Sequence, residues 1–332
     1  MNEVVVIGAS AGGVETLRVL VSRFPRDFPA AVFIVLHTSA GAPNLLTGLL
    51  LRTSTLPVET AANGKAIESG HIYVAPPDNH LLVQRGHMEL VHGPAENGHR
   101  PAIDVLFHSA AHSHGSRVIG VVLTGYLDDG TAGLDTIKRH GGTAVVQNPD
   151  DAIASSMPQH AIDNVEVDYV AAAADIPGLL ASIIREHAND GNRNKDDQSP
   201  HLDYQGGGTP SEFSCPQCNG VLWVVDDSGL LHFRCRVGHS FSPESMAAAQ
   251  DRGLERVLWA ALRALEERAE LATRLARRAK GNKQHFSERR YLERAEKSRH
   301  DAEMLRALVS RPLEPTAEQD DAADLSSTME KA

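Results

Sequence analysis

The 332-residue sequence contains little cysteine, few aromatic residues and no long hydrophobic run. Three cysteines are too few for a disulfide framework, and all of them lie between residues 215 and 235, which favours metal binding over oxidation. No apolar run approaches the ~20 residues that a membrane helix needs, so we expect no membrane insertion. The N-terminus has neither a basic start nor a small-residue cleavage site, and the absence of a secretory signal predicts a cytoplasmic protein.

The chain is acidic overall, with a formal net charge of -11, which argues against nucleic-acid binding. Basic residues outnumber acidic ones in residues 250–309, where they alternate with glutamates. This mixture is typical of a solvated helix surface, so we expect no nucleic-acid partner. A hydrophobic fraction of 42% is ordinary for a globular protein, and the length allows two domains.

Residues 1–188 alternate short β-branched runs with helical patterns. The expected strands are residues 4–7, 31–36, 118–123, 143–146 and 165–170, and the expected helices are residues 12–23, 43–51, 102–114, 130–139 and 175–186. Continuous apolar strands separated by helices predict a mostly parallel sheet that is covered on both faces, a doubly wound α/β domain. Residues 80–92 break this order, and we expect them to form an inserted β-hairpin.

Four further segments follow this domain. Residues 189–212 are polar and glycine-rich and predict a flexible linker, residues 213–249 a small module, residues 250–309 a helical hairpin, and residues 310–332 a disordered acidic tail. Apolar residues recur at helical spacing on both sides of Gly281 and Asn282, which mark the turn of the hairpin. The apolar faces of the two helices suit binding of a signalling partner or self-association.

A serine lies on the turn between the first expected strand and helix. Gly8, Ser10 and Gly12 have the spacing of a nucleophile elbow, in which the serine hydroxyl is exposed above the sheet and backbone N–H groups face a developing oxyanion. A phosphate-binding turn is the alternative interpretation, although the G-x-G-x-x-G pattern of dinucleotide-binding proteins is absent.

Partners for this serine are available at other strand ends. His37 directly follows the strand over residues 31–36, and Asp128 and Asp129 follow the strand over residues 118–123. Because the carboxyl ends of parallel strands meet at one edge of the sheet, Ser10, His37 and one of these aspartates could form a catalytic triad. Spacing does not choose between Asp128 and Asp129.

Residues 1–188 resemble a known family, the CheB-type chemotaxis receptor methylesterases, in several short sequence blocks that occur in the same order. They are residues 6–13 (VIGASAGG), 35–37 (VLH), 73–76 (YVAP) with Asp78 and His80, 100–109 (RPAIDVLFHS), 122–125 (VLTG) with 129–133 (DGTAG), and 157–158 (MP). The resemblance implies a protein-glutamate methylesterase, with glutamine deamidase activity as an addition. It also implies that the cytoplasmic helices of methylated chemoreceptors are the partner and that catalysis needs no cofactor.

The resemblance also implies residue roles. Ser10 is the nucleophile, His37 the general base and then acid, and Asp129, directly before Gly130, the carboxylate that orients the imidazole. We expect the oxyanion and substrate loop to comprise Ala11, Gly12, Thr124, Gly125 and Tyr126.

Three features depart from the family pattern. Ala11 replaces the usual hydroxyl residue, and Tyr126 and Leu127 stand in a loop that is typically Gly-Met-Gly. No phospho-receiver sequence precedes the first strand, so we expect control of activity to come from elsewhere. These departures keep two alternatives open: a binding module that recognises receptor helices without turnover, and a serine esterase for a different ester.

A metal-binding pattern occupies the small module. Cys215 and Cys218 form a Cys-x-x-Cys knuckle, and Cys235 and His239 follow two expected strands joined by a tight turn. Together they make a complete Cys₃His set with no open position, which predicts a structural Zn²⁺ in a zinc-ribbon-like module. Redox chemistry of Cys215 and Cys218 is the minor alternative.

Overall fold

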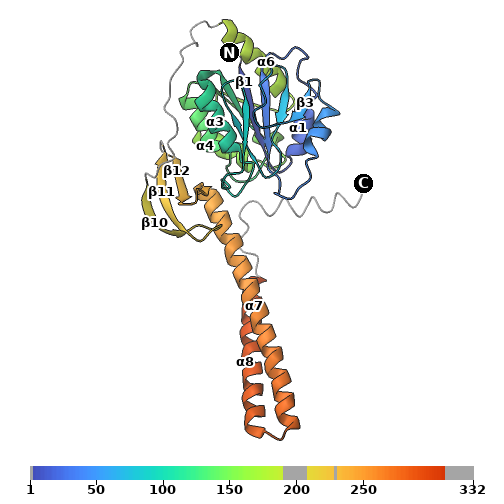
Figure 1. Ribbon diagram of the computed structural model, residues 1–332, viewed down its shortest axis with the longest axis vertical. Helices are drawn as coiled ribbons and strands as arrows, with labels where there is room; N and C mark the ends of the chain where they lie inside the picture. The colour runs from blue at the N-terminus through green and yellow to red at the C-terminus, as the bar shows by residue number, and fades with distance from the viewer. Residues whose placement is uncertain (1–2, 190–207, 228–229, 311–332) are drawn as a thin grey trace. The chain divides into compact units, whose positions relative to one another are not determined.

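A seven-stranded parallel sheet forms the centre of the N-terminal part of the protein in a computed structural model, which describes residues 3–189, 208–227 and 230–310 (Figure 1). The strand order is β3-β4-β2-β1-β7-β8-β9. The strands are β1 (Val4–Ala9), β2 (Ala31–Leu36), β3 (Val58–Thr60), β4 (Ile72–Val74), β7 (Val118–Val122), β8 (Thr143–Gln147) and β9 (Tyr169–Ala171). Every paired register in this sheet is parallel, and β1 lies between β2 and β7. The carboxyl ends of these three strands therefore share one edge.

Helices cover both faces of the sheet, as the sequence predicted. One face packs against α1 (Gly13–Val21) and α6 (Ile176–Asn189), through buried residues such as Leu17, Leu20 and Leu180. The other packs against α3 (Ile103–His114), α4 (Thr131–Arg139) and α5 (Ser156–Asn164). Figure 1 shows α3 and α4 on the side of the sheet opposite α1. Strands buried on both faces explain the continuous apolar runs of β1 and β2.

Short elements complete this part of the chain. They are α2 (Leu46–Leu51), the 3₁₀ turns η1 (Gly115–Arg117) and η2 (Pro149–Asp151), and the antiparallel pair β5 (His80–Val83) and β6 (Met88–Val91). The predicted hairpin is thus present and forms a two-stranded sheet of its own. A loop of residues 93–100 leads from β6 toward α3, and we call it the connecting loop.

A four-stranded antiparallel sheet follows, in the order β10-β11-β12-β13. Its strands are β10 (Thr209–Ser214), β11 (Val221–Asp227), β12 (Leu230–Cys235) and β13 (Ser240–Phe241). We call residues 213–246 the Cys₃His module, after the four residues identified in the sequence.

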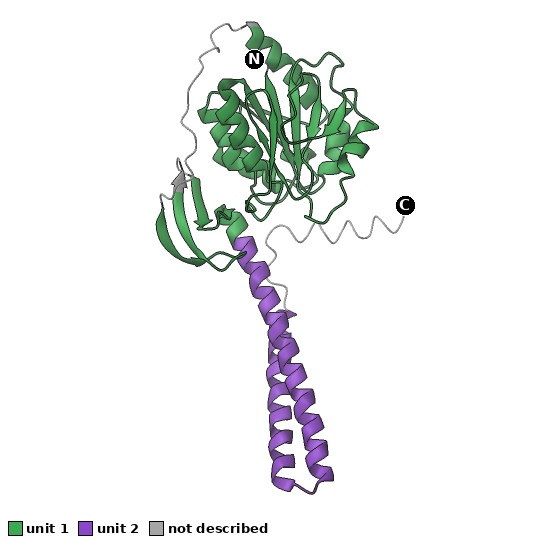
Figure 2. Ribbon diagram, in the orientation of Figure 1, with its two compact units in different colours: residues 1–246 green, residues 247–332 purple. Residues whose placement is uncertain are grey.

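Two long helices form the C-terminal part that the structure describes, α7 (Pro243–Gly281) and α8 (His285–Val309). The chain divides into two compact units, residues 1–246 and 247–332 (Figure 2). In the second unit, Arg299 donates to Thr273 Oγ1 and Arg306 pairs with Glu266, which joins α8 to α7 as a hairpin. No helix of the described residues combines the length and apolar character needed to cross a bilayer.

The structure corrects some predicted boundaries. Residues 209–212, assigned to the linker, belong to β10, and the boundary between residues 249 and 250 falls inside the continuous helix α7. The strand expected over residues 165–170 begins only at Tyr169, because Val165 ends α5. The short strands β3 and β4 were not predicted. Most of the predicted linker, residues 190–207, and the predicted tail beyond residue 310 lie outside the described residues.

Candidate active site

Ser10 lies on a tight turn between β1 and α1. Its backbone N–H donates to Thr124 O at 2.9 Å, and its carbonyl accepts from Gly13 N–H at 2.9 Å. Gly12 makes the turn with a φ of 71°, and a Cβ at this position would approach Ile153 to 2.5 Å. The geometry requires glycine here on both counts, because the left-handed conformation and the close approach both exclude a side chain. The turn holds Ser10 at the carboxyl edge of the sheet.

His37 lies at the same edge, at the end of the neighbouring strand β2. Its backbone N–H donates to Ala9 O at 3.1 Å, which fixes its position beside the serine. The ring places Nδ1 at 3.1 Å from Ser10 Oγ and Nε2 at 2.7 Å from Asp129 Oδ2. The His99 ring stacks on the His37 ring with centroids 3.7 Å apart. The imidazole is therefore held between a hydroxyl and a carboxylate, in the arrangement of a catalytic triad.

Asp129 lies in the loop before α4 and is buried against the N-terminus of α3, with 2% of its surface exposed. Its Oδ2 accepts from Ile103 N–H at 2.7 Å, and its Oδ1 accepts from Asn97 Nδ2 at 2.9 Å and Asp104 N–H at 3.3 Å. Burial acts to raise the pKa of Asp129, but the hydrogen bond and charge of His37, with His99 and Asn97, hold it well below its usual value. An ionised Asp129 accepts the proton of Nε2 and leaves Nδ1 free to take the serine proton.

The adjacent Asp128 faces elsewhere. Its Oδ1 accepts from Ser242 Oγ at 2.7 Å, and burial is the main cause that raises its pKa to about 6. The loop between β7 and α4 turns at Leu127, whose φ is 62°. The resembled family typically has glycine at this position, and glycine adopts that φ without strain. The loop backbone thus brings Asp129, and not Asp128, to His37.

The raised pKa of Asp128 predicts a pH-dependent stability. The carboxyl group of Asp128 binds its proton more tightly in the native state than in the unfolded chain, where an aspartate has a pKa of about 3.9. Stability from this group is fully present below pH 4 and is lost as the pH rises to about 6. We expect Asp128→Asn to raise the free energy of unfolding by about 1–3 kcal/mol at pH 8 and by much less at pH 4.5. Urea unfolding at both pH values measures this, and an equal change at both would contradict it.

The residues expected in the oxyanion and substrate loop have different surroundings. The N–H groups of Thr124 and Gly125 donate to Gln147 Oε1 and Ala154 O, so both are used to hold the loop. A Cβ at Gly125 would approach Ser10 Cβ to 2.8 Å, so glycine lets the chain pass beside the nucleophile turn. Ala11 and Gly12 lie directly at the start of α1, next to Ser10. Tyr126 lies half-buried on the loop between Gly125 and the two aspartates.

A cavity of about 600 Å³ opens beside His37. Its lining includes Arg100 and Asp78. The guanidinium Nη2 of Arg100 lies 2.6 Å from Asp78 Oδ1. Asn97 and His99, two residues of the connecting loop that touch Asp129 and His37, were not identified from the sequence. The connecting loop has no periodic pattern, and its only local signal is the turn-forming pair Asn97 and Gly98 before Arg100.

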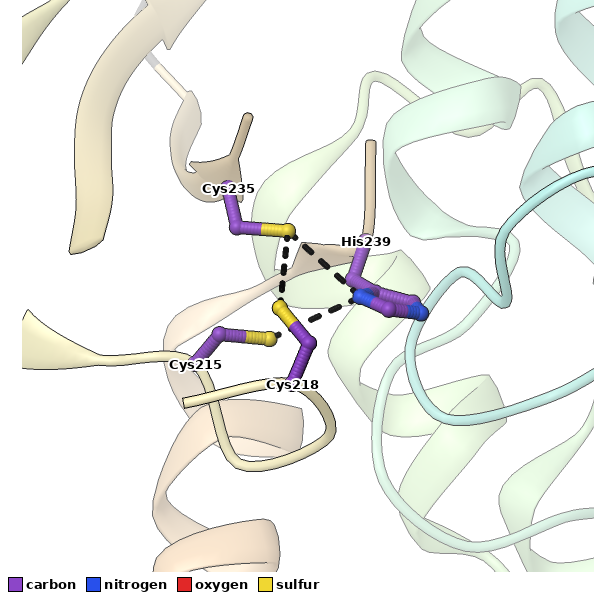
Figure 3. Close-up of side chains that lie close together, drawn as sticks. All are labelled: Cys215, Cys218, Cys235 and His239. Atoms are coloured by element: carbon purple, nitrogen blue, oxygen red, sulfur yellow. Dashed lines mark hydrogen bonds between the residues drawn. The ribbon is translucent and has the colours of Figure 1, made fainter. Parts of the chain in front are cut away.

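The four predicted metal ligands lie together in the Cys₃His module (Figure 3), and all their donor atoms are within 4.8 Å of one another. Cys218 Sγ is 3.6 Å from Cys235 Sγ, and His239 Nδ1 is 3.4 Å from Cys235 Sγ and 3.7 Å from Cys215 Sγ. A tetrahedral zinc ion with normal bond lengths sets S–S separations of roughly 3.8 Å and S–N separations of about 3.6 Å. The donor set therefore fits zinc in both chemistry and spacing.

Comparison with known proteins finds similarity over the N-terminal part. Residues 5–180 match the family model described as CheB methylesterase. A Leptospira interrogans protein named as a protein-glutamate methylesterase/protein-glutamine glutaminase is 38% identical over 179 residues, which cover 54% of this chain and 93% of that one. A protein-glutamate methylesterase/protein-glutamine glutaminase of Sulfurimonas denitrificans is 36% identical over 56% of this chain and 53% of its own length. The crystal structure of the Thermotoga maritima CheB methylesterase catalytic domain superposes with a TM-score of 0.53 and 34% identity, and covers 55% of this chain and 99% of that one.

Proposed function

Because this chain belongs to the CheB methylesterase family, we propose that it is a serine hydrolase that removes methyl groups from glutamate 5-O-methyl esters of chemoreceptors in chemotaxis-type signalling. The observation that carries this proposal is the continuous path from Ser10 Oγ to His37 Nδ1 and from His37 Nε2 to Asp129 Oδ2. Ser10, His37 and Asp129 are then the catalytic residues. Their donors and acceptors suit acyl transfer from an ester carbonyl.

The first step of the proposed reaction forms an acyl-enzyme. Ser10 Oγ attacks the ester carbonyl carbon while His37 Nδ1 takes the hydroxyl proton, and Asp129 stabilises the resulting imidazolium. The N–H of Ala11, at the start of α1, donates to the oxyanion. The C–O bond to the methoxy group then breaks, and His37 Nδ1 returns its proton to the leaving methanol.

The second step releases the product. His37 Nδ1 removes a proton from water, and the water oxygen attacks the acyl carbon. The bond from this carbon to Ser10 Oγ then breaks, and His37 Nδ1 returns the proton to Ser10 Oγ. The glutamate side chain leaves as a free carboxylate. A receptor glutamine follows the same course with ammonia as the leaving group, which accounts for a deamidase activity at the same residues.

A pair of substrates tests the specificity of this proposal. The full chain is incubated with a methylated chemoreceptor cytoplasmic fragment and, separately, with p-nitrophenyl acetate. We expect kcat/KM to be at least about tenfold higher for the receptor ester, because the cleft beside His37 supplies binding that a small ester cannot use. Hydrolysis of the small ester alone would indicate an esterase for another substrate. Failure on both, without labelling of Ser10 by a fluorophosphonate, would indicate a binding module.

We further propose that the Cys₃His module holds a structural Zn²⁺ through Cys215, Cys218, Cys235 and His239. The fit of the donor atoms to a closed tetrahedral site supports this proposal. The ion would stabilise a module that has only a small apolar core, in which Leu222, Phe233, Phe241 and Met246 are buried.

Replacing one ligand tests the metal proposal. We expect the purified full chain to contain about one zinc ion, and Cys235→Ala to retain less than a tenth of that amount after dialysis, because three remaining ligands leave the site open. His232→Ala on the same strand is the matched control and keeps the metal. Elemental analysis by mass spectrometry gives the stoichiometry, and full zinc content in Cys235→Ala would contradict the proposed ligand set.

The predicted contact of the C-terminal helices with a signalling partner or a second copy of the chain stays a prediction. Leu254, Val257 and Trp259 are large apolar side chains of α7 that are about half exposed, as such a contact surface requires.

A further inference from the structure

The connecting loop packs against the Cys₃His module within the first compact unit. Asn97 N–H donates to Ser240 O at 2.9 Å, and Glu96 forms a parallel bridge with Ser240 of β13. Gly238 lies against Pro94, where an added Cβ would come within 3.0 Å of the proline ring. The loop that carries Asn97 and His99 to the triad is therefore also the surface on which the module rests.

The Asn97 side chain joins the module to the catalytic carboxylate. Its Nδ2 donates to Asp129 Oδ1 at 2.9 Å and to Asp104 Oδ2 at 3.0 Å. Its Oδ1 accepts from Ser242 N–H and from Ser245 Oγ, each at 2.9 Å. A side-chain amide has two donor hydrogens and two acceptor lone pairs, so every hydrogen-bonding position of Asn97 is used.

The orientation of this amide follows from its neighbours. Ser242 N–H can only donate, so it must face the amide oxygen, and the ionised carboxylate of Asp129 can only accept, so it must face the amide nitrogen. Asn97 is 4% exposed and has a left-handed φ of 52°, a conformation that asparagine adopts more readily than most residues. Burial and low dielectric strengthen these hydrogen bonds.

The module also borders the cavity beside His37. Gln217 and His239 line it from the module, and His37, His99 and Arg100 line it from the catalytic part. Gln217 lies between the two cysteines of the knuckle and is exposed. A receptor segment that carries the ester to Ser10 would meet the knuckle in this cavity.

We propose that the Cys₃His module is a part of the active site. In this site, Asn97 of the connecting loop is a positioning residue that couples Ser242 and Ser245 of the module to Asp129. Gln217 of the module contacts the receptor segment beside the ester. The contact of Gln217 rests on the proposed methylesterase function, whereas the coupling through Asn97 concerns the triad whatever the ester. Small-ester hydrolysis therefore tests the coupling even if the receptor is not a substrate.

Variants of the full chain test the coupling on p-nitrophenyl acetate. Asn97→Gly fits the left-handed backbone, and we expect it to lower kcat about 10- to 100-fold, because Asp129 loses a charge-assisted hydrogen bond. Ser245→Ala is expected to lower kcat about two- to tenfold alone, but less than twofold in the Asn97→Gly background. Ser182→Ala, an exposed serine of α6, is the matched control with unchanged kcat.

The pH profile separates positioning from a general loss of stability. Asn97→Asp keeps the shape of the side chain but places another carboxylate beside Asp129. The added negative charge favours protonation of the His37 and Asp129 pair, so we expect the acid limb of the kcat profile to move up by about one pH unit. An unmoved acid limb, or a kcat of Ser245→Ala equal to that of Ser182→Ala, would overturn the coupling.

A bulky substitution in the knuckle tests the contact with receptor. We expect Gln217→Trp to raise KM for a methylated receptor fragment at least about fivefold, with KM for the small ester changed less than twofold, because only the larger substrate reaches the knuckle. Glu212→Trp, an exposed position that is not in the cavity lining, is the control. Equal receptor KM values for the two variants would overturn this contact.

Discussion

Ser10→Ala is expected to lower kcat for methyl-ester hydrolysis at least about 10⁴-fold, because the variant has no hydroxyl to form the acyl-enzyme. His37 and Asp129 would remain hydrogen-bonded to each other, but their proton relay would have no nucleophile to activate. Residual hydrolysis would come from binding and oxyanion stabilisation alone. KM should change little, since the substitution removes one hydroxyl group and leaves the residues that line the cavity beside His37 unaltered.

Two measurements read out this prediction. Methanol release gives kcat, and a fluorophosphonate probe with peptide mass analysis gives the modified residue, which we expect to be Ser10 in the unaltered chain and none in the variant. Ser22→Ala is the matched control, because Ser22 caps the C-terminus of α1, the helix that Ser10 precedes, and its hydroxyl donates to Val19 O. Methanol release by Ser10→Ala within tenfold of the unaltered chain would mean that another residue is the nucleophile.

Asp129→Asn is expected to lower kcat by about 10⁴-fold, the effect typical of losing the orienting carboxylate of a triad. An amide can present its N–H to His37 Nε2, which stabilises the tautomer whose proton lies on Nδ1. That tautomer cannot accept the proton of Ser10. The substitution also removes the negative charge that stabilises the imidazolium.

The neighbouring carboxylate provides a matched control for Asp129. Asp128→Asn also replaces one oxygen with an amide nitrogen in the same loop, but Asp128 bonds to Ser242 and not to His37. We expect its kcat to stay within tenfold of the unaltered chain. Equal losses in the two variants, measured on the same substrate by methanol release, would contradict the assignment of Asp129.

Much of the catalytic site could be predicted because it depends on local patterns. The glycines around Ser10 require a tight turn after a strand, and the apolar run before His37 ends at the same edge of a parallel sheet. Spacing could not choose between Asp128 and Asp129, because the choice depends on the backbone of Leu127, whose left-handed φ turns the loop. The family resemblance made that choice, and the structure places Asp129 within hydrogen-bond distance of His37.

The rest of the site depends on contacts that a single sequence does not encode locally. Asn97 meets Ser242 and Ser245 across 145 and 148 positions of the chain. Neither serine lies in a motif, and the connecting loop has no hydrophobic period to fix its conformation. The four proposed metal ligands could be identified in the sequence because their spacing is local, whereas the contact of their module with the catalytic part is a tertiary feature.

Hydrolysis of a methylated chemoreceptor fragment in H₂¹⁸O tests the central claim most directly. Attack of Ser10 on the carbonyl carbon, followed by attack of water on the acyl-enzyme, predicts one ¹⁸O atom in each new glutamate carboxylate and unlabelled methanol. With Ser10→Ala, both products are expected to form at least about 10⁴-fold more slowly. Methanol that carries ¹⁸O would show that the bond between the ester oxygen and the methyl carbon is cleaved, which would contradict an acyl-enzyme at Ser10. If fluorophosphonate labels Ser10 but the protein releases no methanol from the receptor fragment, the receptor ester is not its substrate.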